Sequence, residues 1–196
     1  MKKLVFFLAI ICYWFIFQRT SSVEYGPGVL APGIPIQEKI VLRTNFPFKD
    51  YTITPLAKFH IKAKTLSVKT YRSGRESELS PVDLALGWGR MSDESILESI
   101  DISQSGRWYK WHANEFPIPR REIETNSANM HLIPANKEIE SKIKRARRGD
   151  VVEFSGSLIR VDANDGWRWV SSLTRKDTGG HSCELVFVEN FSVKTF

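Results

Sequence analysis

The stretch that decides the fold is VVEFSGSLIRVDANDGWRWVSSL, which occupies residues 151–173. Its apolar and β-branched residues predict a strand at Val151–Phe154 and a second strand, or the continuation of the first, at Leu158–Val161. The next segment, DANDG, ends in Asp-Gly, a strong signal for a tight turn between antiparallel strands. Trp167–Leu173 is the returning strand. The stretch therefore predicts a β-sheet that folds back on itself.

Further strands are predicted on both sides of this stretch. They are Ile40–Leu42, Ala57–Tyr71, Ile102–His112, Cys183–Phe187 and Phe191–Val193. In Ala57–Tyr71 the apolar positions are odd-numbered up to Ala63 and even-numbered from Leu66, so we expect a bulge or turn near Lys64 and Thr65. Several short strands separated by turns are typical of a small β-barrel or a rolled antiparallel sheet.

Two or three short helices are predicted between the strands. Ser80-Pro81 has the form of a helix start, and Ser92 is placed to cap a helix over Asp93–Ile100. Asn136–Arg148 is the third helix, with basic residues crowded at its C-terminal end, which we interpret as a solvated face. Its apolar stripe consists of Ile139, Ile143 and Ala146. The expected fold class is therefore mainly β, an α+β domain.

The N-terminus has the form of an export signal. Residues 1–3 include two lysines, and residues 4–17 (LVFFLAIICYWFIF) form an uncharged, mostly apolar run. The run is shorter than the roughly 20 residues of a full membrane span. Its bulky aromatic end favours retention as a signal anchor, whereas Thr20 and Ser22 would suit cleavage after Ser22. In either case the positive flank stays in the cytoplasm and the rest of the chain is exported.

These features divide the chain into three parts. Residues 1–19 are a signal anchor or signal peptide, residues 20–37 are a linker with three Pro and three Gly, and residues 38–196 are the soluble β-rich domain. The expected location is the inner or cytoplasmic membrane with the domain outside the cytoplasm, in the periplasm or cell envelope; secretion after cleavage is the alternative. Residues 23–196 carry 25 basic and 22 acidic residues, a charge of +3 that is too small to indicate nucleic-acid binding.

Cys183 is the only cysteine outside the apolar run. In an oxidising compartment a single thiol is ordinarily buried, and a reactive thiol is the alternative. A nucleophilic thiol needs a base and a group that holds negative charge, and His131 and Arg175 are the candidates for these catalytic roles. The four His and Cys183 have no H-x-x-x-H or C-x-x-C spacing, so we predict no metal and no other cofactor.

Five tryptophans lie in the exported region, and basic residues are interleaved with them. The candidate ligand-binding residues are Trp88, Trp108, Trp111 and Arg107. Indole faces flanked by polar groups stack on sugar rings or anchor a protein partner. The alternative is that the rings belong to the core, an interpretation that suits Trp167 and Trp169 because they share one strand face.

The general layout resembles that of sortases, in which an N-terminal anchor and a linker precede a β-barrel with a catalytic His before a G-D-x-V-x-F strand. His131 and the run GDVVEF at 149–154 carry this resemblance. The order then departs from the sortase pattern, because Arg175 follows Leu173-Thr174 where a sortase has its cysteine, and Cys183 comes later. The two residues would have to exchange places for the resemblance to imply a cysteine-dependent hydrolase or transpeptidase.

A second resemblance, to an uncharacterised family of bacterial envelope proteins, spans residues 80–190. It is carried by ISQS at 102–105 with RWY at 107–109, SANMHLIP at 127–134, DGW at 165–167 and SSLTR at 171–175. It implies no activity. We therefore expect a non-catalytic, membrane-anchored extracytoplasmic binding or assembly module. Its partner would be a protein or a cell-wall glycan and no nucleic acid, and it would contact the membrane through residues 4–17. The alternative is the sortase-like enzyme.

Overall fold

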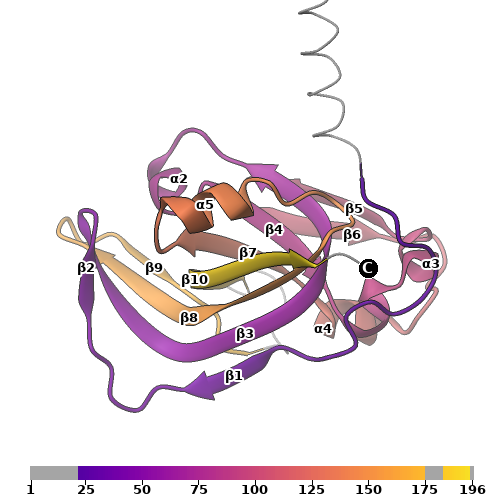
Figure 1. Cartoon of the computed structure of the whole chain (residues 1–196), viewed down its shortest axis with the longest axis horizontal. Coiled ribbons are helices and arrows are strands. Elements are labelled where there is room, and N and C mark those ends of the chain that lie inside the picture. The colour runs from indigo at the N-terminus through magenta and orange to yellow at the C-terminus, as the bar shows by residue number, and fades with distance from the viewer. Residues whose placement is uncertain (1–21, 175–182, 195–196) are drawn as a thin grey trace, which may run out of the picture.

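The computed structural model describes residues 22–174 and 183–194, and β-strands dominate this part of the chain (Figure 1). The strands are β1 (Ile36–Lys39), β2 (Phe46–Phe48), β3 (Tyr51–Thr70), β4 (Val82–Gly87), β5 (Asp101–Ser105), β6 (Trp108–His112), β7 (Ser127–Pro134), β8 (Val151–Ala163), β9 (Arg168–Val170) and β10 (Glu184–Lys194). The helices are α2 (Arg75–Leu79), the 3-10 helix η1 (Gly89–Ser92), α3 (Glu94–Leu97), α4 (Arg120–Thr125) and α5 (Lys137–Ile143). The predicted mainly β, α+β fold with few short helices is confirmed.

Eight of the strands form one sheet in the order β1-β3-β4-β7-β10-β8-β9, with β2 paired to β3. The long strand β3 organises this sheet because its two ends have different partners. Tyr51–Lys64 pairs with β8, whereas Lys64–Thr70 pairs with β4, so the sheet curls around β3 (Figure 1). Within the described residues a closed barrel is not found. The sheet is not wholly antiparallel either, because β10 runs parallel to β7.

One bulge and one turn in the strand pattern lie where the sequence predicts them. The register between β3 and β4 shifts between Thr65 and Ser67, which confirms the predicted bulge next to Lys64. The chain turns after β8 at the Asp-Gly pair, where Gly166 has a φ of 89°. β8 is continuous from Val151 to Ala163, so the second predicted strand is the continuation of the first.

Four local predictions are wrong. Ser80-Pro81 begins no helix: it leads into β4, whose residues are all buried and so lack the alternation that marks a half-exposed strand. Ile102–His112 is not one strand but the hairpin of β5 and β6. Ile40–Leu42 is not a strand, since β1 ends before it. Asp93, and not Ser92, caps α3 by accepting a hydrogen bond from the Ser95 N–H.

The core lies between the curled sheet and α5, which packs against β7 and β10 (Figure 1). Asn136 caps α5 by accepting a hydrogen bond from the Ile139 N–H at 3.0 Å. The predicted stripe is confirmed, because Ile139, Ile143 and Ala146 pack into one cluster with apolar residues of β3, β4, β7, β8 and β10. The helix itself ends at Ile143, earlier than predicted. A second cluster lies under β2 and β9, and a third lies under the β5–β6 hairpin.

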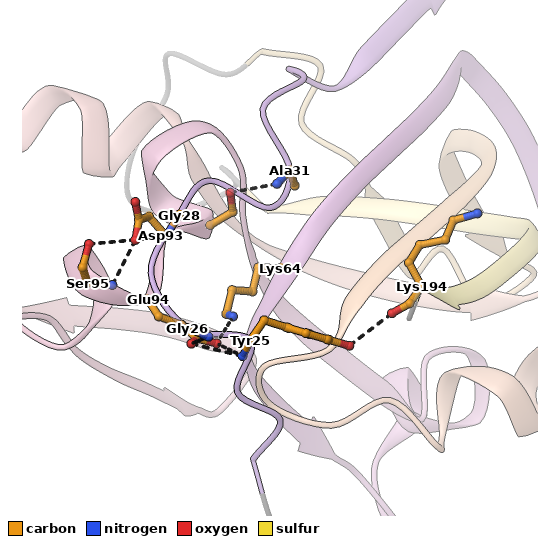
Figure 2. Close-up of polar contacts among 10 residues, drawn as sticks. Tyr25, Gly26, Gly28, Ala31, Lys64, Asp93, Glu94, Ser95 and Lys194 are labelled. Carbon is orange, nitrogen blue, oxygen red and sulfur yellow. Dashed lines mark hydrogen bonds and ion pairs between the residues drawn. The ribbon is translucent and has the colours of Figure 1, made fainter. Parts of the chain in front are cut away.

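Residues 22–31, the N-terminal strap, lie along η1 and α3 (Figure 2). They belong to the segment predicted as a linker, 20–37. The Tyr25 and Gly28 N–H groups donate to the carboxylates of Glu94 and Asp93, and Gly89 donates to the carbonyl of Ala31. Ile36–Lys39 then pairs with β3 as strand β1. Residues 23–31 and 36–37 of the predicted linker therefore contact the domain; the boundary at residue 38 stays a prediction.

Candidate ligand-binding groove

The β5–β6 hairpin packs against β3 and β7, and Arg107 at its tip contacts Asp83 of β4. Its turn residues, Gly106 and Arg107, both have positive φ, 56° and 70°, the conformation that matches the twist of a tight hairpin. Tyr109 and Trp111 face the sheet and pack with the third apolar cluster. Burial raises the pKa of Tyr109 to about 12. The alternate residues Trp108, Lys110 and His112 are exposed, so one face of β6 packs on the domain and the other faces solvent.

A groove of about 740 Å³ lies between this hairpin, α4 and the first residues of β7. Its lining includes Trp108, Trp111, Phe116, Arg120, Asn129 and Cys183. Trp108 is 47% exposed and Phe116 is 52% exposed, so both leave ring surface open to solvent. The Trp111 ring meets Phe116 edge-on with centroids 6.1 Å apart, and the Arg120 guanidinium lies 5.9 Å from the Trp111 centroid. Arg120 also pairs with Glu124 of the groove lining at 2.9 Å, so the groove offers flat aromatic faces beside an ion pair.

A buried charge cluster holds the hairpin tip against β4 and β7. Arg107 Nη1 donates to Asp83 Oδ1 at 2.6 Å, and His131 Nδ1 lies 2.9 Å from Asp83 Oδ2. Asp83 is fully buried, where an unpaired carboxylate would be costly. The Arg107 guanidinium also lies 3.7 Å from the centroid of the Tyr71 ring. Burial, and then the charge of Asp83, raise the pKa of Tyr71.

Asn129 links this charge cluster to the groove. Its side-chain nitrogen donates to the carbonyl of Arg107 at 3.1 Å and lies 4.0 Å from the Cys183 sulfur, while its oxygen accepts from Gln104 at 2.6 Å. The parallel register pairs Leu185 with His131, so Cys183, two residues earlier, lies beside Asn129 on the same face. Cys183 and the Asp83–His131 pair therefore flank Asn129 on one surface of the sheet.

The structure brings together some of the predicted site residues and separates others. Trp88, Trp108, Trp111 and Cys183 all line the groove, but Trp88 is only 2% exposed and most of its ring packs in the core. Arg107 lies in the hairpin turn, paired with Asp83, and does not line the groove. His131 is buried, with its ring 5.0 Å from that of Trp169. Arg175, the third predicted catalytic residue, lies outside the described residues.

Sequence reasoning missed Asp83, although the sequence contains a signal for it. The run VDLALG has a single charge among apolar residues, and a charge inside such a run needs a buried partner. Phe116 and Arg120 were also missed because they flank a proline-rich loop and not a strand.

Among residues 22–174 and 183–194, no group of three or more His, Cys, Asp and Glu side chains is placed to hold a metal ion. No helix in this described part is long and apolar enough to cross a membrane. The chain matches no protein-family model, no curated protein and no solved structure.

Proposed function

We propose that the chain is a non-catalytic binding module of the bacterial envelope, held at the cytoplasmic membrane by residues 4–17, and that the groove beside the β5–β6 hairpin binds a cell-wall glycan. The observation that carries the proposal is the pair of half-exposed rings, Trp108 and Phe116, on a groove that also contains Arg120. Flat aromatic faces beside polar groups suit the apolar faces and hydroxyls of sugar rings.

The connectivity of the central strands supports this ligand class. β3, β4, β7, β10 and β8 pair in that order, β8 also pairs with β3, and α5 lies between β7 and β8 in the chain. This connectivity resembles that of OB-folds, partly open five-stranded barrels that bind oligosaccharides and oligonucleotides on the face of their second and third strands. The corresponding strands here are β4 and β7, and the groove lies at β7. The proposed location outside the cytoplasm favours the oligosaccharide.

The test is calorimetric titration of the full chain in detergent with soluble glycan strands prepared from peptidoglycan. We expect saturable binding that Trp108→Ala weakens by about tenfold, the effect of losing about 1.4 kcal/mol of contact. The matched control is Leu42→Ala, which removes an exposed apolar side chain far along the sequence from the groove. Absence of binding, or equal affinities for the two variants, would rule out the groove as a glycan site.

A second candidate is the cysteine-dependent hydrolase or transpeptidase. The observation that favours it is the Asp83–His131 contact of 2.9 Å, on the same sheet surface as Cys183, because a base needs an orienting partner. The burial of His131 against Trp169 favours the structural role, since a general base must reach its proton.

The rate of thiol alkylation against pH separates the two candidates, measured on a Cys12→Ser background so that Cys183 alone reports. A binding module should react as an ordinary thiol of pKa about 8.5, unchanged by His131→Gln. Fast alkylation at low pH that slows in His131→Gln would instead establish the enzyme.

A further inference from the structure

The N-terminal strap, residues 22–31, ties the domain to the apolar segment that comes before it in the chain. Figure 2 shows Tyr25 between its two contacts: its N–H donates to the Glu94 carboxylate at 3.0 Å and its hydroxyl donates to the Lys194 carbonyl at 3.2 Å. Lys64, which is buried, lies 2.5 Å from Glu94 and supplies the countercharge. Further along the strap, the Ala31 N–H donates to the Ser92 hydroxyl. The strap is therefore bound along its length.

The strap starts at the turn that follows α5. The Val23 N–H donates to the carbonyl of Arg148 at 2.8 Å. Gly149 makes this approach possible, because a Cβ at that position would lie 1.7 Å from the Val23 carbonyl oxygen. The chain thus joins the domain beside residues 144–149.

Only residues 18–21 separate the end of the apolar run, Phe17, from Ser22. A chain of this length spans at most about 18 Å between the two Cα atoms. With residues 4–17 inserted in the membrane, as the proposed function requires, the turn after α5 is held close to the headgroups on the side where the domain lies.

This turn is strongly basic. Residues 141–150 contain five basic residues and one acidic residue, Asp150, which is buried. Lys144, Arg145 and Arg148 are exposed. Lys144 pairs with Glu140, and Arg145 donates to the Ser141 hydroxyl, so both contacts lie at the surface where they exchange readily with other anions. Glu24 is an exposed acid on the neighbouring strap.

We propose that residues 144–148 contact the phosphates of anionic phospholipids in the membrane that holds the N-terminal segment. The inference rests on the anchoring part of the proposed function. Lys and Arg within a Debye length, about 8 Å at physiological salt, are attracted to an anionic bilayer surface. The basic end of α5 is then a second membrane contact that sets which side of the domain faces the bilayer.

The test reconstitutes the full chain in nanodiscs of phosphatidylcholine, with and without phosphatidylglycerol, and measures amide hydrogen exchange over residues 144–149. We expect exchange at least about threefold slower with phosphatidylglycerol at physiological salt, and no difference at 1 M salt, where the Debye length is about 3 Å. The double variant Arg145→Gln/Arg148→Gln should lose the difference. Lys39→Gln/Lys58→Gln, at exposed lysines on β1 and β3, should keep it.

If the chain is inserted and amide exchange is equal in both lipid compositions, the proposed lipid contact is wrong. The proposed glycan binding is unaffected by that result, because it is measured separately in detergent. Failure of the chain to insert into either nanodisc overturns the anchor and the lipid contact together. A lipid effect that persists equally in Arg145→Gln/Arg148→Gln refutes the assignment to these residues.

Discussion

The N-terminal strap and the β5–β6 hairpin are each held by a carboxylate, the half-buried Glu94 of α3 for the strap and the buried Asp83 of β4 for the hairpin, but the donors differ. Glu94 accepts from the backbone N–H groups of Tyr25 and Gly26, with Lys64 as the countercharge. Asp83 accepts from a side chain, the guanidinium of Arg107, while the His131 ring lies 2.9 Å from its other oxygen. A backbone donor is present at every residue except proline, so we expect the bonds to Glu94 to survive side-chain changes at their donors, whereas a change at Arg107 removes the bond to Asp83. The attachment of the hairpin, next to the groove, depends on few side chains.

The largest effect should come from the hairpin side, with Asp83→Ala. The change leaves the largely buried Arg107 without its carboxylate, which we expect to destabilise the fold by about 3–5 kcal/mol, measured by urea unfolding. In the double variant Asp83→Ala/Arg107→Ala part of this loss should be recovered, because no charge is then left unpaired. A loss below about 1 kcal/mol for Asp83→Ala would show that the cluster does not hold the hairpin.

A smaller effect is expected on the strap side, with Gly149→Ala. The added Cβ meets the Val23 carbonyl, and the residue has a φ of 91° that alanine adopts with strain. We expect a loss of about 1–3 kcal/mol with faster exchange of the Tyr25 and Gly26 amides. Gly166→Ala is the matched control, since Gly166 has a φ of 89° and no neighbour near the new Cβ. Equal amide exchange in the two variants would contradict the role of Gly149 in docking the strap.

The smallest effect is a pH dependence of the strap contacts made by Glu94. Burial alone would raise the pKa of Glu94, but the Lys64 ammonium and the Tyr25 and Gly26 amides lower it more, so its pKa falls below the ordinary value of 4.5. A depressed pKa means that the carboxylate stabilises the docked strap above about pH 4.5, and that this stabilisation is lost as pH falls through the folded-state pKa. Protection of the Tyr25 and Gly26 amides, corrected for intrinsic exchange, should therefore decrease under acid.

Glu94→Gln is the control for this pH dependence, because the glutamine side chain does not titrate. Its strap protection should be lower at neutral pH and should change less with acid than that of the parent chain. The same pH profile in both proteins would exclude Glu94 as the titrating group.

The local parts of this fold could be predicted from the sequence, and the parts set by distant partners could not. The Asp-Gly turn and the register shift beside Lys64 depend on neighbouring residues, and both were predicted. β4 was predicted as a helix start because Ser80-Pro81 is a local signal, whereas the burial of both faces of β4 is decided by the whole sheet. Trp108 and Trp111 could be predicted as binding residues because basic residues are interleaved with the tryptophans in the sequence. The partner of His131 could not be predicted, because Asp83 lies on another strand.

The pairing of β3 with β8 also sets the order in which the chain can fold. His60 on β3 contacts Glu153 on β8 across 93 residues of sequence, and Tyr25 contacts Lys194 across 169. Such non-local pairing slows folding, since the entropy of closing long loops is lost before the contacts form. If the chain is exported as proposed, with its N-terminal flank kept in the cytoplasm and the following residues crossing in order, the apolar side of β3 stays exposed until the last third of the chain has followed. During that interval the chain is most exposed to aggregation and proteolysis, and a holding chaperone would protect it there.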